Sequence, residues 1–159
     1  GMKLKLLGAV EAVNETQKVT LVDKIVSRFG PDLTGRRFAL WGLAFKPGTD
    51  DMREAPSLVV IKHLTERGAT VCAYDPVAMD EGRKHTQGWR GIDFASSAPA
   101  AIQGADALVI VTEWKEFRSP DFPELKRSLK QPLIFDGRNL FDPAFVREAG
   151  LDYVCIDRP

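Results

Sequence analysis

The sequence contains only two cysteines and two histidines among its 159 residues. Cys72 and Cys155 do not form a Cys-x-x-Cys pair, and each lies in an apolar, alternating stretch. We therefore expect two reduced, buried strand cysteines, and neither a disulfide framework nor a catalytic thiolate. His63 and His85 have no partner at metal-ligand spacing, so we expect no metal site.

The sequence also lacks an excess of charge and a long apolar run. Lys plus Arg equals Asp plus Glu at 22 each, so no basic field attracts nucleic acid. No run of eighteen apolar residues and no signal segment occur, so we expect a cytoplasmic protein with no membrane partner. A hydrophobic share of 44% in a chain of this length is typical of one soluble globular domain.

The third absence is the Gly-x-Gly-x-x-Gly loop of dinucleotide-binding proteins. Residues 38–56 read as a buried strand, a break at Gly42, a polar loop and a helix that restarts after Pro56. Proteins of the α/β class place ligands in such loops, at the carboxyl end of the sheet. Because Lys46 and Arg53 stand where the glycines would be, we expect an anionic ligand held by side chains.

The hydrophobic pattern predicts a Rossmann-like, three-layer α/β/α domain with a mainly parallel sheet of about six strands, preceded by a long helix. The helix covers residues 6–29, ends at Gly30-Pro31, and must pack on its own sheet or on a second copy of the chain. The expected strands are 37–42, 69–74, 92–94, 107–112, 132–136 and 153–156. The expected helices are 55–67, 77–86, 98–103, 121–128 and 143–149.

Phe45 and Lys46 together offer an apolar wall and a point charge, which suit a sugar nucleotide; the alternative for Lys46 is a solvated side chain. Arg53 follows Asp50 and Asp51, so a local ion pair is the alternative to a binding role. Arg138 follows the fifth strand, where its guanidinium can grip a phosphate or sugar hydroxyls.

For Arg138, the alternative to ligand binding is a pair with Asp136. Three further residues also lie at strand ends, namely Asp75, Glu113 and Trp114. Asp75 closes the second strand, where a dinucleotide fold places an acid for a ribose hydroxyl. Without the glycine motif we favour a structural role for Asp75. Trp114 is interpreted as a lid or packing residue, and Glu113 has no partner that the sequence identifies.

Four segments in order resemble the C-terminal, nucleotide-binding domain of bacterial UDP-glucose 6-dehydrogenases. They are residues 44–56 (Ala-Phe-Lys-Pro-Gly-Thr-Asp-Asp-Met-Arg-Glu-Ala-Pro), 73–78 (Ala-Tyr-Asp-Pro-Val-Ala), 112–117 (Thr-Glu-Trp-Lys-Glu-Phe) and 135–140 (Phe-Asp-Gly-Arg-Asn-Leu). Residues 13–18 resemble the helix that joins the family's middle domain to this one. The resemblance implies that residues 1–30 are a connecting helix and 31–159 a UDP-sugar-binding domain. Asp157 stands where similar proteins usually carry glycine, which concerns only the local turn.

The resemblance also implies roles for individual residues. Phe45 and Lys46 would contact the UDP-sugar, Arg53 would reach NAD held by the N-terminal domain, and Arg138 would contact the substrate of a neighbouring subunit. The enzyme would oxidise UDP-glucose to UDP-glucuronate in two hydride transfers.

The family's Gly-Gly-x-Cys-x-Pro-Lys-Asp motif and its glycine loop are absent from this sequence. We therefore expect no catalytic residue here and an inactive fragment, which would end at the natural C terminus of a longer homodimeric or larger enzyme. The alternatives are a dehydrogenase of GDP-mannose or UDP-N-acetylmannosamine, or a nucleotide-sugar-binding module without catalysis.

Overall fold

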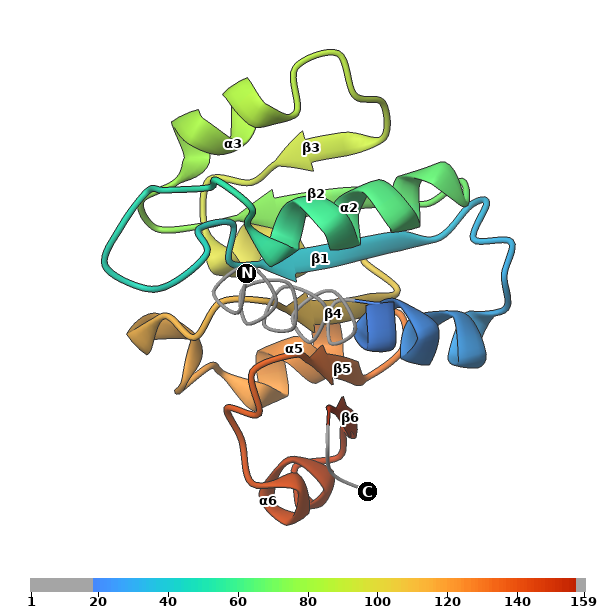
Figure 1. Ribbon diagram of the computed structural model, residues 1–159. Helices are drawn as coiled ribbons and strands as arrows, with labels where there is room; N and C mark the ends of the chain where they lie inside the picture. Colours follow the sequence, from blue (N-terminus) through green and yellow to red (C-terminus); the bar gives the residue numbers. More distant parts are fainter. Residues whose placement is uncertain (1–18, 157–159) are drawn as a thin grey trace, which may run out of the picture.

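The protein is built on one sheet of six parallel strands, seen in a computed structural model that describes residues 19–156 (Figure 1). The strand order is β3-β2-β1-β4-β5-β6, and every neighbouring pair is parallel. The strands are β1 (Arg37–Trp41), β2 (Thr70–Tyr74), β3 (Ile92–Phe94), β4 (Ala107–Ile110), β5 (Leu133–Asp136) and β6 (Asp152–Cys155). The order reverses between β1 and β4, which is where such sheets open a crevice for a ligand.

Helices connect the strands, as the alternating pattern predicts. They are α2 (Pro56–Glu66), α3 (Met79–His85), α4 (Ala98–Ile102), α5 (Phe122–Ser128), α6 (Pro143–Glu148) and a helix at 19–29. Proline occupies the first turn of α2, α4, α5 and α6, where its missing N–H costs nothing. Within the described residues, the predicted elements match to within two residues, apart from the short 3₁₀ helix η1 (Lys115–Phe117), which the sequence pattern did not predict.

Two hydrophobic cores lie on the two faces of the sheet. Side chains alternate along a strand, so Phe38 and Leu40 of β1 join one core while Ala39 and Trp41 join the other. The first core is closed by α2 and the helix at 19–29, and the second by α4, α5 and α6. The domain therefore has the three-layer α/β/α architecture that the sequence predicts (Figure 1).

The helix at 19–29 packs on the sheet of its own chain. Leu21, Val22 and Ile25 are buried in the first core. Phe29 packs edge-on against Phe38 with ring centroids 5.3 Å apart. For this stretch the structure selects the first of the two alternatives. Val10 and Val13, in the N-terminal part of the predicted helix, lie outside the described residues.

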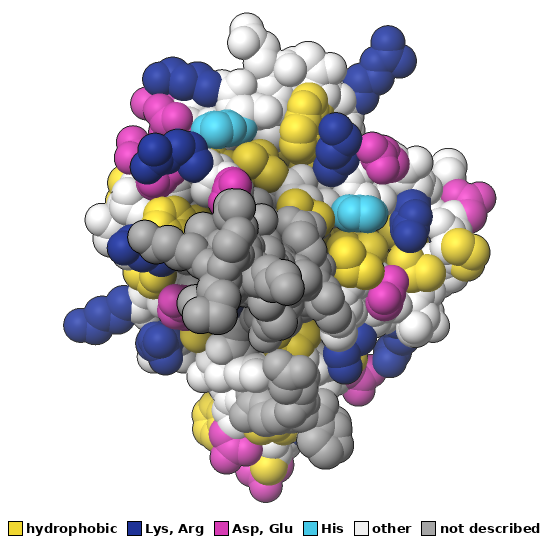
Figure 2. Space-filling model, viewed as in Figure 1, with side chains coloured by type: hydrophobic (Ala, Val, Ile, Leu, Met, Phe, Trp, Pro, Cys, Tyr) yellow, Lys and Arg dark blue, Asp and Glu magenta, His cyan; other side chains and the backbone are white. Residues whose placement is uncertain are grey.

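Both cysteines are buried and free. Among residues 19–156 no group of three or more His, Cys, Asp or Glu side chains could hold a metal ion. In the same range, each helix is too short or too polar to cross a bilayer. On the visible face, basic and acidic side chains are interspersed (Figure 2), as expected for a sequence with equal numbers of each.

Candidate functional site

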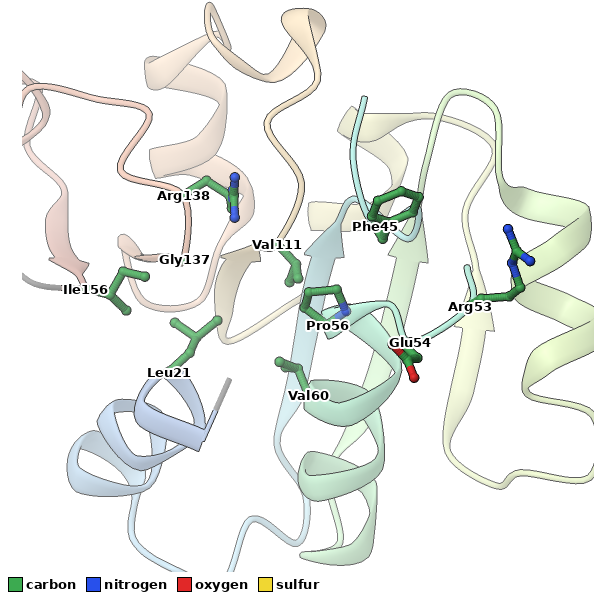
Figure 3. Close-up of a pocket in the computed structure, with 10 residues that line it drawn as sticks. All are labelled: Leu21, Phe45, Arg53, Glu54, Pro56, Val60, Val111, Gly137, Arg138 and Ile156. Carbon is green, nitrogen blue, oxygen red and sulfur yellow. The ribbon is translucent and has the colours of Figure 1, made fainter. Parts of the chain in front are cut away.

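A pocket of about 340 Å³ opens near the carboxyl end of the sheet (Figure 3). It collects residues from the helix at 19–29, from α2, from the loops after β1, β4 and β5, and from the residue that follows β6. The lining consists of Leu21, Phe45, Arg53, Glu54, Pro56, Val60, Val111, Gly137, Arg138 and Ile156. Six of these side chains are apolar, and Arg53, Glu54 and Arg138 are charged.

Three of the four predicted site residues, Phe45, Arg53 and Arg138, line this pocket. The fourth, Lys46, is outside the lining; its Nζ lies 5.3 Å from the centre of the Phe45 ring. Lys46 is exposed, and among the described residues no carboxylate pairs with it. An anionic ligand above Phe45 would find this ammonium group free.

Asp75 organises the loops around the pocket. Its side chain is only 1% exposed. Oδ2 accepts hydrogen bonds from the backbone N–H groups of Leu43 (2.8 Å) and Ala44 (3.0 Å) and from the indole Nε1 of Trp114 (2.9 Å). Oδ1 accepts from two further backbone amides, those of residues 77 and 78, both at 2.8 Å. One carboxylate thus joins the loops that follow β1, β2 and β4.

The loop after β1 is also held through its carbonyl groups. Ser57 Oγ donates to Leu43 O at 2.6 Å, and Thr112 Oγ1 donates to Ala44 O at 2.6 Å. Every backbone polar group of residues 43 and 44 therefore has a buried partner. Phe45 comes next in the chain, and 41% of its surface is exposed. A fixed backbone presents this aromatic ring to the pocket.

Gly42 permits the close approach of β1 to β4. Its φ is +102°, and a Cβ at this position would lie 2.5 Å from the Thr112 Cβ.

Because five protein groups already donate hydrogen bonds to the Asp75 carboxylate, it has no oxygen to offer to a ribose. The structural interpretation of Asp75 is confirmed, and Trp114 is a packing residue, as expected.

Arg138 lies in a loop that a second buried aspartate holds. Asp136 Oδ1 accepts from the Arg138 backbone N–H at 2.8 Å, and Oδ2 accepts from Leu140 N (2.7 Å) and Tyr153 Oη (2.6 Å). Burial raises the pKa of the Tyr153 phenol, and the bond to Asp136 raises it further. The alternative of a side-chain pair between Asp136 and Arg138 is not what the structure shows, because Asp136 accepts from two backbone N–H groups and from the Tyr153 hydroxyl instead.

The carboxylate that does pair with Arg138 is Glu113, which accepts from the guanidinium Nε. The sequence identified no partner for Glu113, since 25 residues separate the two. The pair is partly exposed, at 44% for the Arg138 side chain and 24% for Glu113. Both lie on loops that leave the sheet next to each other, after β4 and β5.

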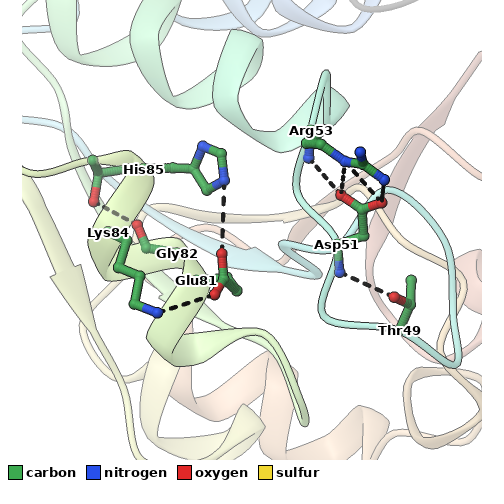
Figure 4. A network of polar contacts seen from close by, with 8 residues as sticks. Thr49, Asp51, Arg53, Glu81, Gly82, Lys84 and His85 are labelled. Atoms are coloured by element: carbon green, nitrogen blue, oxygen red, sulfur yellow. Dashed lines mark hydrogen bonds and ion pairs between the residues drawn. The ribbon is translucent and has the colours of Figure 1, made fainter.

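Arg53 forms a local pair with Asp51 (Figure 4). Its Nη2 lies 2.8 Å from Oδ2 and its backbone N 2.9 Å from Oδ1. The side-chain bonds first, and then the backbone bond, lower the pKa of Asp51 to about 2. The Arg53 side chain is 85% exposed, so the local pair leaves most of it accessible. On the neighbouring helix α3, Glu81 contacts Lys84 and His85.

Sequence reasoning missed the residues that hold the loops, above all Ser57, Thr112 and Tyr153. Thr112 follows an apolar strand directly, which signals a hydroxyl near the edge of the sheet but not its partner. Leu21 and Ile156 line the pocket from opposite ends of the described chain. No local pattern brings such distant positions together.

A doubly wound parallel sheet with cationic side chains at its carboxyl edge defines a Rossmann-like nucleotide-binding class of domain. Residues 39–143 match the model of the UDP binding domain of the UDP-glucose/GDP-mannose dehydrogenase family. The chain belongs to this family.

Relatives of known sequence support the same assignment. The UDP-glucose 6-dehydrogenase of Pseudomonas aeruginosa is 47% identical over 100% of this chain and 36% of its own length. The enzyme of Rhizobium meliloti is 41% identical over 98% of this chain and 35% of its own length. The chain spans about a third of the relatives that it matches.

Solved structures agree in fold. A UDP-glucose dehydrogenase from Pyrobaculum islandicum superposes with a TM-score of 0.73 at 30% identity, covering 93% of this chain and 31% of that one. A GDP-mannose dehydrogenase from Pseudomonas aeruginosa gives 0.62 at 25% identity, covering 83% and 30%. The Rossmann-like fold is thus shared with enzymes that act on different nucleotide sugars.

Asp75→Asn should destabilise the chain, because an amide nitrogen would face N–H groups that now donate to a carboxylate. We expect a loss of about 3 kcal/mol in the free energy of unfolding, measured by urea denaturation. Asp80→Asn on the exposed face of α3 is the control; equal stability of the two variants would contradict the role of Asp75.

The pKa of Asp51 should depend on Arg53. The folded value of about 2 lies below the ordinary aspartate value of 3.8, so the pair stabilises the native state above pH 3.8. This contribution disappears as the pH falls through 2. In Arg53→Ala the carboxyl should titrate near its ordinary value, as followed by ¹³C NMR. An unchanged Asp51 titration in that variant would show that the pair does not form.

Proposed function

We propose that the chain is the substrate-binding part of an NAD-dependent UDP-glucose 6-dehydrogenase, which oxidises UDP-glucose to UDP-glucuronate in two hydride transfers. The observation that carries the proposal is the convergence of Phe45 and Arg138 on one pocket. These residues come from the loops after β1 and β5, and the ammonium group of Lys46 lies 5.3 Å from the centre of the Phe45 ring. Phe45 belongs to the segment 44–56 and Arg138 to the segment 135–140. The fold brings these two separate segments together at one pocket.

The pocket has the chemistry that a UDP-sugar requires. Its apolar side chains, among them Val60, Val111 and Ile156, can cover one face of a sugar or base ring. Lys46, which pairs with no carboxylate of residues 19–156, supplies a positive charge for a diphosphate. Arg138 supplies planar donors for phosphate or hydroxyl oxygens. We assign Phe45, Lys46 and Arg138 to the substrate; Arg138 can serve the substrate of a neighbouring subunit.

A complete NAD site does not fit the residues of this chain. The loop after β1 has no glycine cradle, and the buried Asp75 has no free oxygen for a ribose. We therefore propose that another domain of the same enzyme holds NAD. Arg53, with its 85% exposed side chain, would reach the cofactor from this side. The chain would contribute no catalytic residue.

UDP-glucose is favoured over other nucleotide sugars by the relatives. Four proteins that are 38–47% identical to this chain carry the name UDP-glucose 6-dehydrogenase. The solved dehydrogenases of UDP-N-acetylmannosamine and GDP-mannose are 26% and 25% identical. A module without catalysis is the remaining alternative. We further propose that residues 1–30 connect to a middle domain and that the full enzyme is a cytoplasmic homodimer or larger assembly.

Lys46→Ala in the full-length enzyme should weaken binding of UDP-glucose. Removal of one charge-assisted hydrogen bond costs about 1.5–3 kcal/mol, which corresponds to a KM roughly tenfold to 150-fold higher. Steady-state kinetics of NADH formation measure the change. Lys130→Ala, an exposed lysine in the loop before β5, is the control. Wild-type KM and kcat in Lys46→Ala would remove Lys46 from the site.

The 159-residue chain alone should not reduce NAD in the presence of UDP-glucose. Both of its cysteines are buried, and burial raises the pKa of the Cys72 thiol, so neither supplies a reactive thiolate. The assay follows absorbance of NADH, with the full-length enzyme as the positive control. Turnover by the purified chain would overturn the assignment of catalysis to other domains.

A further inference from the structure

Arg138 has a rigid backbone but a long side chain. Hydrogen bonds to Asp136 fix the backbone at residues 138 and 140, and the N–H of Gly137 donates to Ile110 O at 2.9 Å. These bonds do not restrain the guanidinium group, which several rotatable bonds separate from the backbone. A flexible arginine must lose rotamer freedom when it binds a ligand.

Glu113 is the described side chain that restrains this guanidinium. Its own position is fixed on both sides along the chain. Thr112 is 1% exposed and donates to Ala44 O, while the Trp114 indole donates to buried Asp75. The same network that fixes the Phe45 loop therefore also fixes the backbone around Glu113, whose short side chain reaches Arg138 from there.

The contact uses only one edge of the guanidinium. Nε donates to Glu113 Oε2, and neither Nη group has a partner among the described residues. Arg138 reaches from the β5 loop toward the middle of the pocket, facing the side that Phe45 closes (Figure 3). The fork of Nη donors thus stays available to a ligand while the other edge is occupied.

We propose that Glu113 is a positioning residue for substrate binding, which orients the Arg138 guanidinium toward the pocket before the substrate arrives. This inference rests on the proposed function of the site. In the opposite role, the Glu113 carboxylate would compete with the substrate for Arg138. The two roles predict opposite changes in KM when Glu113 is removed.

A double-mutant cycle in the full-length enzyme separates these roles, with KM for UDP-glucose as the readout. Glu113→Ala should raise KM by about tenfold and leave kcat within about twofold, because the contact acts on binding. In the Arg138→Ala background the same change should alter KM by less than about twofold. Glu113→Gln, which keeps an acceptor oxygen for Nε, should restore most of the loss. Glu66→Ala, an exposed residue at the far end of α2, is the control.

Each outcome decides a different claim. An unchanged or lower KM in Glu113→Ala, with a raised KM in Arg138→Ala, would overturn the positioning role and leave the proposed function intact. An equal effect of Glu113→Ala in both backgrounds would also overturn it, since the residue would then act independently of Arg138. Unchanged KM in Lys46→Ala and Arg138→Ala would remove the proposed site itself. Thermal melts check the fold of every variant. If Glu113→Ala is unstable, Glu113→Ser, which also removes the carboxylate, takes its place in the cycle, with the rise in KM again expected only where Arg138 is present.

Discussion

The carboxylate of Asp75 is the interaction on which the ligand edge of this domain depends. A buried charge is tolerated only when its hydrogen-bonding capacity is filled, and here five donors from three loops fill it. The same bonds fix the loop after β1, the turn after β2 and the indole beside Glu113. Loss of this one group would remove a hydrogen-bond partner from three segments at once.

Asp136 repeats the same arrangement on the other half of the sheet. It ends β5 as Asp75 follows β2, and its oxygens also bind backbone N–H groups and one side-chain donor. Both aspartates point into the protein, and basic side chains nearby in the chain or in space point outward. An anionic ligand bound at this edge, as proposed, would meet Lys46 and Arg138 without facing the carboxylates that hold their loops. The buried aspartates thus hold the loops, and the exposed basic side chains are the groups left accessible to a ligand.

The sequence predicted the strands well because both faces of a parallel sheet are buried, which leaves continuous apolar runs such as residues 107–110. It also placed Phe45, Lys46 and Arg138 at strand ends, since topology brings those ends to one edge. It could not predict that Glu113 pairs with Arg138 while Asp136 does not. This pairing depends on how the loop that carries Glu113 is oriented. Two contacts between residues far apart in the sequence orient it: Trp114 donates to Asp75, 39 residues away, and Thr112 donates to Ala44, 68 residues away. The helix at 19–29 had two possible partners for the same reason: an apolar stripe specifies burial but not the surface that buries it.

The packing around Gly42 explains why backbone N–H groups of the loop after β1 are not available to a ligand, as they are in a dinucleotide fold. In a dinucleotide fold, the loop after the first strand stays open so that backbone N–H groups can meet a pyrophosphate. Here the loop is drawn onto β2 and β4: Gly42 N donates to Tyr74 O, and the contact with Thr112 leaves no room for a Cβ. The backbone N–H groups of residues 43 and 44 point inward and donate to Asp75. A ligand must then bind farther out, where Phe45, Arg53 and Arg138 are exposed by 41%, 85% and 44%. Groups so open to water gain strength only when another surface excludes water from them, so the geometry of this edge favours a site completed by a second domain or subunit.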